Sequence, residues 1–239
     1  LHNYGYFRGD VDYHIVESND SLAARVAYDV TMGPVFHLDS IEYRSFGTQA
    51  DSLLEASTSK RLLKSGDAFN VVNLNAEQQR IEGIMRNGGY YYWNSSYTAF
   101  QADTLAVPGY VQLRVLPKAG IPGEALRPWY IGHTYITIRD QKNSPLDHEL
   151  KGRRGTTSYL WSGDVMPAKT RIWRSAINHR HGRIFRQSDQ ENTISKLAAL
   201  GTLSSLEVSY TPRDTSALCD TLDVHVNVMM GNPYDSSFE

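Results

Sequence analysis

Apolar residues alternate with polar ones in pairs of short runs that recur along the chain. In the clearest pair, residues 206–210 and 222–228 carry an apolar residue at every second position, with a polar turn between the two runs. This period predicts an antiparallel strand pair with one solvated face and one face covered by helices. The same pattern predicts two further strand pairs, at 11–16 with 25–30 and at 97–100 with 110–115.

Helical patterns precede two of the three strand pairs. Each begins with a polar residue followed three positions later by Gln or Glu, which resembles a capping box, and continues with an apolar face. A glycine then stands where the helix would end in the left-handed conformation. The boxes are Asn75 with Gln78 and Ser188 with Glu191, the apolar faces are Ile81, Ile84 and Met85 and then Ile194, Leu197 and Ala198, and the glycines are Gly88-Gly89 and Gly201.

Another strand and another helix are predicted upstream of each of these helices. The strands are predicted at 36–43 and 130–138. A helix that starts near Pro167 and ends at Gly182 carries an apolar stripe, and residues 52–63 show a weaker form of the pattern. The stripe consists of Ile172, Ala176 and Ile177. The repeating unit is therefore an α+β module of the order β-α-α-β-β, with a three-stranded mixed sheet and two helices on one face.

This unit occurs three times, and the first copy lacks its opening strand and both helices. The chain also starts at Leu1 in the middle of the pattern, so we expect a fragment without its targeting segment. Prolines and glycines near Pro34 and at 117–128 indicate linkers, and an insertion lies mainly between Arg139 and Thr170. We expect the C-terminal part of a first module at 1–34, a second module at 35–120, a third at 127–231 and a linker at 232–239.

Composition narrows the class of protein. Hydrophobic residues make up 41% and charged residues 21%, as in folded soluble domains, so the chain is not predicted to be disordered. A net charge of -2 argues against a general nucleic-acid binder. The single cysteine, Cys219, excludes an internal disulfide and a cysteine-based metal cluster. No apolar run approaches the roughly 18–20 residues of a membrane-spanning helix.

Histidines are the nearest approach to a metal site. His179 and His181, with His133 or His148, could supply nitrogen ligands, but zinc needs three or four converging groups. A histidine at the end of a helix is also favoured by the helix dipole. We therefore predict no metal, no cofactor and no catalytic residue.

Other candidate sites have simpler explanations. Asp103-Thr104 and Asp214-Thr215 recur in turns, where such side chains bind their own backbone, and no known catalytic motif is present. The basic stretch 171–186 could face anionic lipid, although a solvated helix face is the simpler interpretation. The aromatic run Tyr90–Trp93 could bind a glycan, or it could form the corner of a repeat, with one ring packed and another exposed.

A β-α-α-β-β unit whose helix ends in a glycine-aromatic corner resembles the POTRA (polypeptide-transport-associated) domain. The run 100–104 before a valine-rich strand looks like the outer-membrane assembly factors of the BamA/TamA type, with a TamA-like branch as the expected one. The third copy departs from the pattern, because Gly201 is followed by Thr202 and not by an aromatic residue. The matching residues are Gly5-Tyr6-Phe7, Gly89-Tyr90-Tyr91, Gly66-Asp67-Ala68-Phe69 and Gly182-Arg183-Ile184-Phe185.

This resemblance implies a non-enzymatic periplasmic arm that receives unfolded outer-membrane protein clients or accessory assembly subunits. It also implies a C-terminal membrane barrel outside this chain and no nucleic-acid partner. An exposed edge strand that accepts an extended peptide would supply the binding. The candidate edge residues are Val11, Tyr13 and Ile15, then Tyr97, Thr98 and Ala99, and then Val208, Ser209 and Tyr210.

Three alternatives remain open from the sequence. The named edges could be ordinary edge strands that neighbouring domains cover. The chain could be the POTRA arm of a two-partner secretion transporter, which serves one dedicated substrate. It could also be a periplasmic or surface glycan-binding protein that uses Tyr91 and Trp93.

Overall fold

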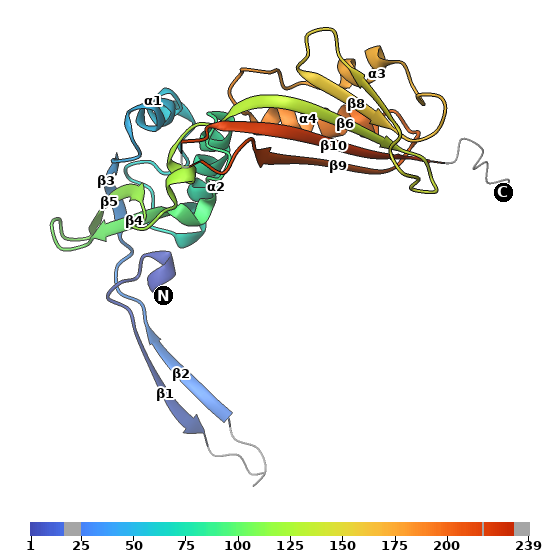
Figure 1. The fold of residues 1–239 in the computed structure, drawn as a ribbon. Coiled ribbons are helices and arrows are strands. Elements are labelled where there is room, and N and C mark those ends of the chain that lie inside the picture. Colours follow the sequence, from blue (N-terminus) through green and yellow to red (C-terminus); the bar gives the residue numbers. More distant parts are fainter. Residues whose placement is uncertain (17–24, 217, 232–239) are drawn as a thin grey trace. The chain divides into compact units, whose positions relative to one another are not determined.

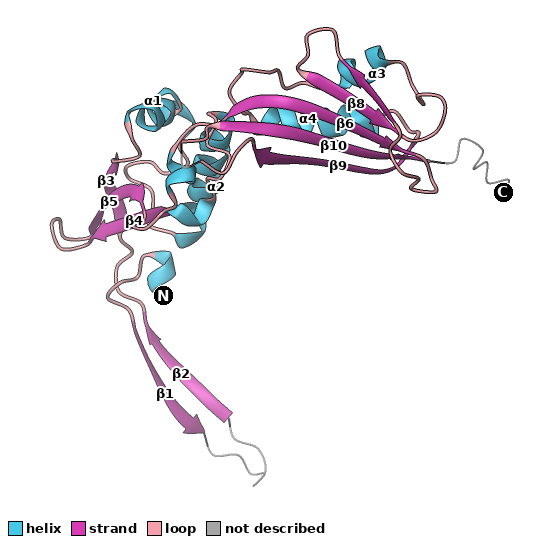
Figure 2. Ribbon diagram, viewed as in Figure 1, coloured by secondary structure: helices cyan, strands magenta, loops and turns pink. Residues whose placement is uncertain are grey.

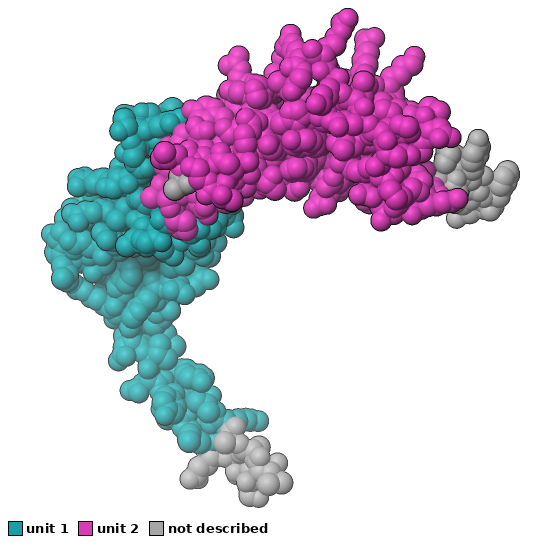
Figure 3. Space-filling view, viewed as in Figure 1, with its two compact units in different colours: residues 1–82, 94–121 teal, residues 83–93, 122–239 magenta. Residues whose placement is uncertain are grey.

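The computed structural model describes residues 1–16, 25–216 and 218–231 (Figures 1 and 2). It confirms the α+β class, since helices accompany three separate sheets. The chain forms two compact units, which Figure 3 colours separately. Unit 1 contains Leu1–Glu82 and Asn94–Ile121, and unit 2 contains Gly83–Trp93 and Pro122–Glu239. The linker predicted at 232–239 lies outside the described residues.

Unit 1 begins with a short 3-10 helix and a two-stranded ribbon. The helix η1 (His2–Tyr4) ends at Gly5, whose φ of 82° is left-handed. Strands β1 (Asp10–Val16) and β2 (Arg25–Thr31) pair in antiparallel fashion. Their apolar side chains share one face and are exposed. A ribbon of two strands cannot bury such a face by itself, which is consistent with an incomplete module, although the assignment of 1–34 stays a prediction.

The second sheet lies in the same unit and has the predicted three-stranded mixed form. Its order is β3-β5-β4, with β3 (His37–Tyr43) parallel and β4 (Thr98–Asp103) antiparallel to β5 (Tyr110–Pro117). Alternate residues of β5 are buried, as the alternation predicts. The associated helices are α1 (Thr48–Ala56), η2 (Thr58–Lys60), α2 (Val71–Asn87) and η3 (Ser95–Tyr97).

The third sheet, in unit 2, has five strands in the order β7-β8-β6-β10-β9. The prediction of three strands is therefore too low for this module, because the insertion between 139 and 170 adds two strands beside β6. The strands are β6 (Tyr130–Arg139), β7 (His148–Lys151), β8 (Thr157–Trp161), β9 (Leu203–Pro212) and β10 (Thr221–Met230). The helices of this part are η4 (Gly123–Leu126), α3 (Thr170–Ala176) and α4 (Gln187–Ala198).

The two predicted capping boxes are wrong, whereas the glycines predicted after α2 and α4 are confirmed. The helix predicted from near Pro167 to Gly182 is wrong in both bounds, because α3 covers only Thr170–Ala176. Helix α2 starts at Val71, one turn before Asn75, and the Asn70 Oδ1 atom accepts a hydrogen bond from the Val72 N–H at 2.8 Å. In α4, Ser188 lies inside the helix, and its N–H donates to the Asn87 Oδ1 atom at 3.0 Å. In both helices an asparagine side chain that the pattern did not indicate accepts a first-turn N–H, although the N-cap residue of α4 is Arg186. Gly89 and Gly201 have left-handed φ angles of 101° and 67°, as predicted.

Candidate functional site

The edge strand β9 offers a long row of free main-chain groups. Arg213 N–H donates to Thr221 O, so the odd-numbered residues of β9 bond to β10 and the even-numbered ones face away. The outward N–H and C=O groups therefore belong to Leu206, Val208 and Tyr210. Glu207 is the only charged residue in the ten residues of β9. Few charges and a long edge leave this strand open to pairing.

The opposite edge of the same sheet is protected. Strand β7 has only four residues, and its outward main-chain groups belong to Glu149 and Lys151, because Gly152 N–H donates to Thr157 O and sets the alternation. A short, charged edge strand discourages addition of a further strand. The insertion thus covers the side of β6 and leaves β9 as the accessible edge of this sheet.

The other predicted edges are less favourable. On β4, the Thr98 carbonyl already accepts a hydrogen bond from the Gln78 side chain at 2.8 Å, and the Thr98 side chain is buried. Tyr97 lies in η3 and not in a strand, and Ala99 follows Thr98 on β4. The β1 residues Val11, Tyr13 and Ile15 are well exposed, but they belong to a ribbon of two strands with acidic side chains.

Glycine-aromatic corners form two equivalent junctions. At the second corner, Gly89-Tyr90-Tyr91, the Gly89 carbonyl accepts a hydrogen bond from Trp129 N–H at 2.9 Å. The Tyr91 ring packs against Phe185 and Tyr210 with centroid distances of 4.9 and 5.5 Å. Tyr210 belongs to β9, so the rings of this corner pack against a side chain of the edge strand.

The first corner, Gly5-Tyr6-Phe7, makes the same contacts in unit 1. The Gly5 carbonyl accepts from Phe36 N–H at 2.9 Å, and the Phe7 ring lies 5.3 Å from Phe36 and 4.9 Å from Phe69. Phe36 therefore corresponds to Trp129, and Phe69 to Phe185. The repeat inferred from the sequence is present in the hydrogen bonds as well as in the order of elements.

Substituting Gly89 with alanine is expected to destabilise unit 2 by about 2 kcal/mol. A Cβ atom there would lie 2.5 Å from Ile184 Cγ1, and the φ of 101° strains any residue with a side chain. The measurement is urea unfolding followed by tryptophan fluorescence, because all four tryptophans lie in unit 2. Gly83→Ala in α2 is the matched control: nothing lies within 4 Å of its Cβ, so stability should rise by about 0.5 kcal/mol. Equal effects of the two substitutions would contradict the strained corner.

The aromatic run is packed and does not form a platform. Trp93 is fully buried and Tyr90 nearly so, while Tyr91 and Tyr92 are half-buried against the core of unit 2. The expectation that one ring would be exposed is therefore wrong, because Tyr91 and Tyr92 both pack against the core of unit 2. Trp93 is buried and the Tyr91 ring packs against Phe185 and Tyr210, so the structure gives a glycan site on these two rings no support.

The four histidines considered as metal ligands do not converge. Within the described residues, no group of three or more His, Cys, Asp or Glu side chains could hold a metal ion. His181 Nδ1 contacts Gly132 O at 2.9 Å, and His133 Nε2 contacts Ser158 Oγ at 3.0 Å. His148 stacks on Trp161, and His179 is buried beside Thr134. Burial lowers the pKa of His179 to about 4.

The remaining candidates have structural roles or are solvated. Asp103 Oδ1 accepts hydrogen bonds from two following backbone N–H groups, and Asp214 Oδ1 accepts one from Ser216 N–H. Cys219 is a free cysteine between β9 and β10, and it is buried in the core of unit 2. The arginines of the stretch 171–186 are exposed. Among the described helices, none is long and apolar enough to cross a membrane.

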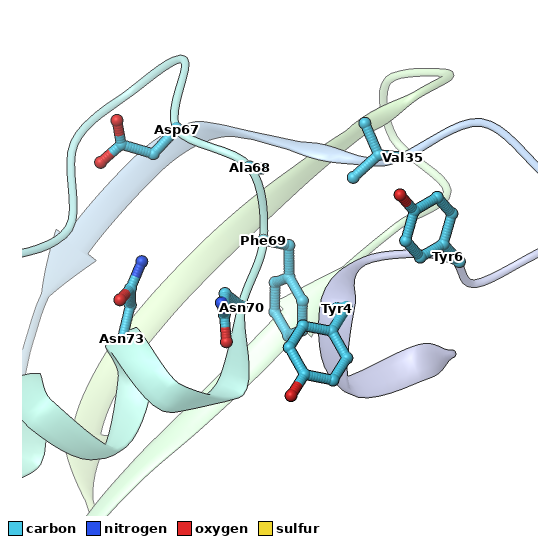
Figure 4. Close-up of a pocket in the computed structure, with 8 residues that line it drawn as sticks. All are labelled: Tyr4, Tyr6, Val35, Asp67, Ala68, Phe69, Asn70 and Asn73. Carbon is cyan, nitrogen blue, oxygen red and sulfur yellow. The ribbon is translucent and has the colours of Figure 1, made fainter.

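Two features were missed by the sequence analysis. One is a hollow of about 520 Å³ in unit 1, lined by Ala68 and its neighbours (Figure 4). The other is a buried carboxylate, Glu77, which the helical pattern gave no reason to place inside. The sequence contained a signal for the hollow. The segments 66–69 and 182–185 align, and the small Ala68 stands where the other segment has the larger Ile184.

Solved structures similar to this chain contain POTRA domains. BamA from Haemophilus ducreyi lacking POTRA domains 1-3 matches with a TM-score of 0.51 and 16% identity, over 83% of this chain and 30% of that one. BamA POTRA3-5 from Haemophilus influenzae matches with a TM-score of 0.49 and 15% identity, over 95% and 74%. No protein-family model matches the chain, and the search of curated proteins finds no similar sequence. This chain therefore has the α+β fold of POTRA domains.

Proposed function

We propose that this chain is part of the periplasmic arm of an outer-membrane protein assembly or translocation factor, and that it binds client or accessory polypeptides at the edge of β9. The observation that carries the proposal is the row of outward main-chain groups at Leu206, Val208 and Tyr210, on a strand with a single charged residue. The POTRA fold supports the setting, and the resemblance of 100–104 supports a BamA/TamA-type factor, TamA-like in its branch.

Strand addition explains how such an arm would serve many clients. An extended peptide gains main-chain hydrogen bonds along β9 whatever its sequence, and alternate side chains give modest selectivity. The edge is also preorganised, because Tyr210 is fixed between Tyr91 and Phe185 at centroid distances of 5.5 and 5.2 Å. A rigid edge loses little conformational entropy when it binds.

Photocrosslinking in cells tests the proposal. A photoreactive residue at Ser209, on the solvated face of β9, should form adducts with several nascent outer-membrane proteins when placed in the full-length protein. Glu149 on the protected edge β7 is the matched control and should give few adducts. Adducts with one dedicated substrate would favour the two-partner secretion alternative. Equal labelling from both positions, or none from Ser209, would count against binding at β9.

Proline at an outward position should separate strand addition from general surface contact. Val208→Pro removes an outward N–H without breaking the β9–β10 ladder, so client adducts from Ser209 should fall by roughly tenfold while the fold remains. Glu207→Pro, at an inward position, should lower the thermal unfolding temperature instead. Unchanged adduct yields with Val208→Pro would show that clients do not pair with this edge.

A further inference from the structure

The hollow in unit 1 lies where the first corner meets the start of α2. Figure 4 shows Phe69 behind Tyr4, with Tyr6 beside Val35 and Asn73 on the first turn of the helix. Its lining combines apolar side chains with carboxylate, amide and phenol groups. The lining residues are Tyr4, Tyr6, Val35, Asp67, Ala68, Phe69, Asn70 and Asn73.

The equivalent place in unit 2 is filled. The segments 66–69 and 182–185 make the same hydrogen bonds: Leu38 N–H donates to Asp67 O and Ile131 N–H to Arg183 O, both at 2.8 Å. Single antiparallel bridges join His37 to Ala68 and Tyr130 to Ile184. Ala68 therefore occupies the position of Ile184.

The two positions differ in what covers the corner glycine. A Cβ on Gly89 would meet Ile184 Cγ1 at 2.5 Å and Cδ1 at 2.6 Å, so the isoleucine side chain lies directly over that glycine. The three nearest atoms to a Cβ on Gly5 would be the carbonyl oxygens of Phe69 and Phe36 and the Phe69 Cβ atom, at 3.0–3.3 Å. Ala68 is not among the three nearest neighbours of that position, and the hollow is lined by Ala68 and by Tyr4 and Tyr6, the residues on either side of Gly5.

Ala68 also offers main-chain groups to a ligand. Its neighbours Asp67 and Phe69 bond inward to β3, so the Ala68 N–H and C=O point away from that strand. Neither group has a hydrogen-bond partner within the described part of the chain. The exposed Ala68 thus presents one donor and one acceptor beside an apolar space.

We propose that this hollow binds an extended polypeptide segment, which pairs with Ala68 and places one aliphatic side chain over Gly5, as Ile184 is placed over Gly89. The inference rests on the proposed function that this chain binds polypeptides, and it adds a second site with a side-chain preference. The β9 edge binds main chain, whereas the hollow selects a branched aliphatic residue. The side chains of Asn70 and Asn73 line the hollow beside Ala68, and the Asn70 Oδ1 atom already accepts the Val72 N–H.

Filling the hollow is the direct test. Fluorescent nonapeptides with alternating apolar and polar residues, carrying either Ile or Ala at the centre, are titrated into the 239-residue chain and followed by anisotropy. Ala68→Ile should lower the affinity for the Ile peptide at least about tenfold, and the Ala peptide should bind the unchanged chain that much more weakly. Ala119→Ile, at an exposed alanine of the same unit, is the matched control and should change nothing. Circular dichroism checks that each variant is folded.

Crosslinking separates this inference from the proposed function. A photoreactive residue at Asn73 should label the Ile peptide, and one at Ser209 should label both peptides. Labelling from Ser209 alone, with no effect of Ala68→Ile, would overturn the hollow as a site and leave the β9 edge standing. Labelling from Asn73 within the same polypeptide chain would show that the chain fills its own hollow, which also overturns the inference. No peptide binding at either position would remove both proposals.

Discussion

Replacing Glu77 with alanine is expected to lower the free energy of unfolding of unit 1 by about 3–5 kcal/mol. Glu77 is fully buried, and both carboxylate oxygens are used. They accept hydrogen bonds from the Tyr43 hydroxyl at 2.5 Å, Leu62 N–H at 3.0 Å and the Arg80 guanidinium at 2.5 and 2.8 Å. The substitution leaves a nearly buried arginine charge and two further donors without their partner, which costs more than the lost contacts alone.

Tyr43 is a second partly buried member of the hydrogen-bond network around Glu77. Burial raises the pKa of Tyr43, and the hydrogen bond to Glu77 raises it further. The Arg61 guanidinium lies over the Tyr43 ring at 4.0 Å from its centroid. The carboxylate thus joins strand β3, helix α2 and the segment after η2, so its loss should loosen the whole of unit 1.

Two optical signals make the test specific. Tryptophan fluorescence reports unit 2 alone, whereas far-ultraviolet circular dichroism reports both units, so the part of the circular dichroism change that fluorescence does not follow in urea belongs to unit 1. Glu77→Ala should lower the midpoint of the transition assigned to unit 1 and leave the fluorescence midpoint of unit 2 unchanged. Glu55→Ala, at an exposed glutamate of α1, should stay within about 0.5 kcal/mol of the original chain. If the two substitutions have similar effects, the buried network does not hold unit 1 together.

The elements of the fold follow from the sequence because alternation and helical period report burial directly. Strands β3, β6, β9 and β10 coincide with predicted runs, and Gly89 and Gly201 end their helices. Helix starts were misplaced because the side chains that accept the first-turn N–H groups, Asn70 and Asn87, stand outside the pattern, and Asn87 lies 101 residues from Ser188. Glu77 was missed because a helical pattern assigns a glutamate to the solvent face unless its partners are known.

The strands of the insertion between 139 and 170 could not be predicted from the sequence pattern. The spacing of the repeats revealed the insertion itself, but β7 and β8 have only four and five residues. The sequence of β7, His-Glu-Leu-Lys, shows no alternation of apolar and polar residues. Their strand character comes from pairing with β6, which is a tertiary effect. The candidate edge on β9 was predicted, yet which of its residues face outward depends on the hydrogen-bond register. Tyr97 was placed in a strand because the run 97–100 matched the recurring pattern of strand pairs, whereas the backbone at Tyr97 forms η3.

Acidification is expected to destabilise unit 2 through His179. This side chain is 6% exposed, and its Nδ1 atom has no hydrogen-bond partner in the described residues. Its surroundings include the Tyr210 ring, with centroids 6.1 Å apart, and Thr134 Oγ1 at 3.4 Å from Nε2. None of these groups is an anion that would stabilise an imidazolium, so burial lowers the pKa of His179 from 6.5 to about 4.

Proton linkage fixes the direction in which the stability of unit 2 changes with pH. The unfolded chain binds the proton below pH 6.5, whereas the folded chain binds it only near pH 4. The contribution of neutral His179 to the free energy of unfolding is therefore fully present above pH 6.5. It decreases as the pH falls toward 4 and stays constant below that value. Between pH 7.5 and 4.5 this one group should remove about 2.5 kcal/mol from the free energy of unfolding of unit 2.

His179→Leu isolates that contribution. Urea midpoints of unit 2, read by tryptophan fluorescence at pH 7.5 and 4.5, should fall further for the original chain than for the variant, by about 2.5 kcal/mol of unfolding free energy. His148→Gln, at a less buried histidine of the same unit, should keep the full pH dependence. Because Tyr210 packs beside His179 and lies on β9, client adducts from Ser209 should weaken over the same pH range. An unchanged pH dependence in His179→Leu would place the acid sensitivity elsewhere in unit 2.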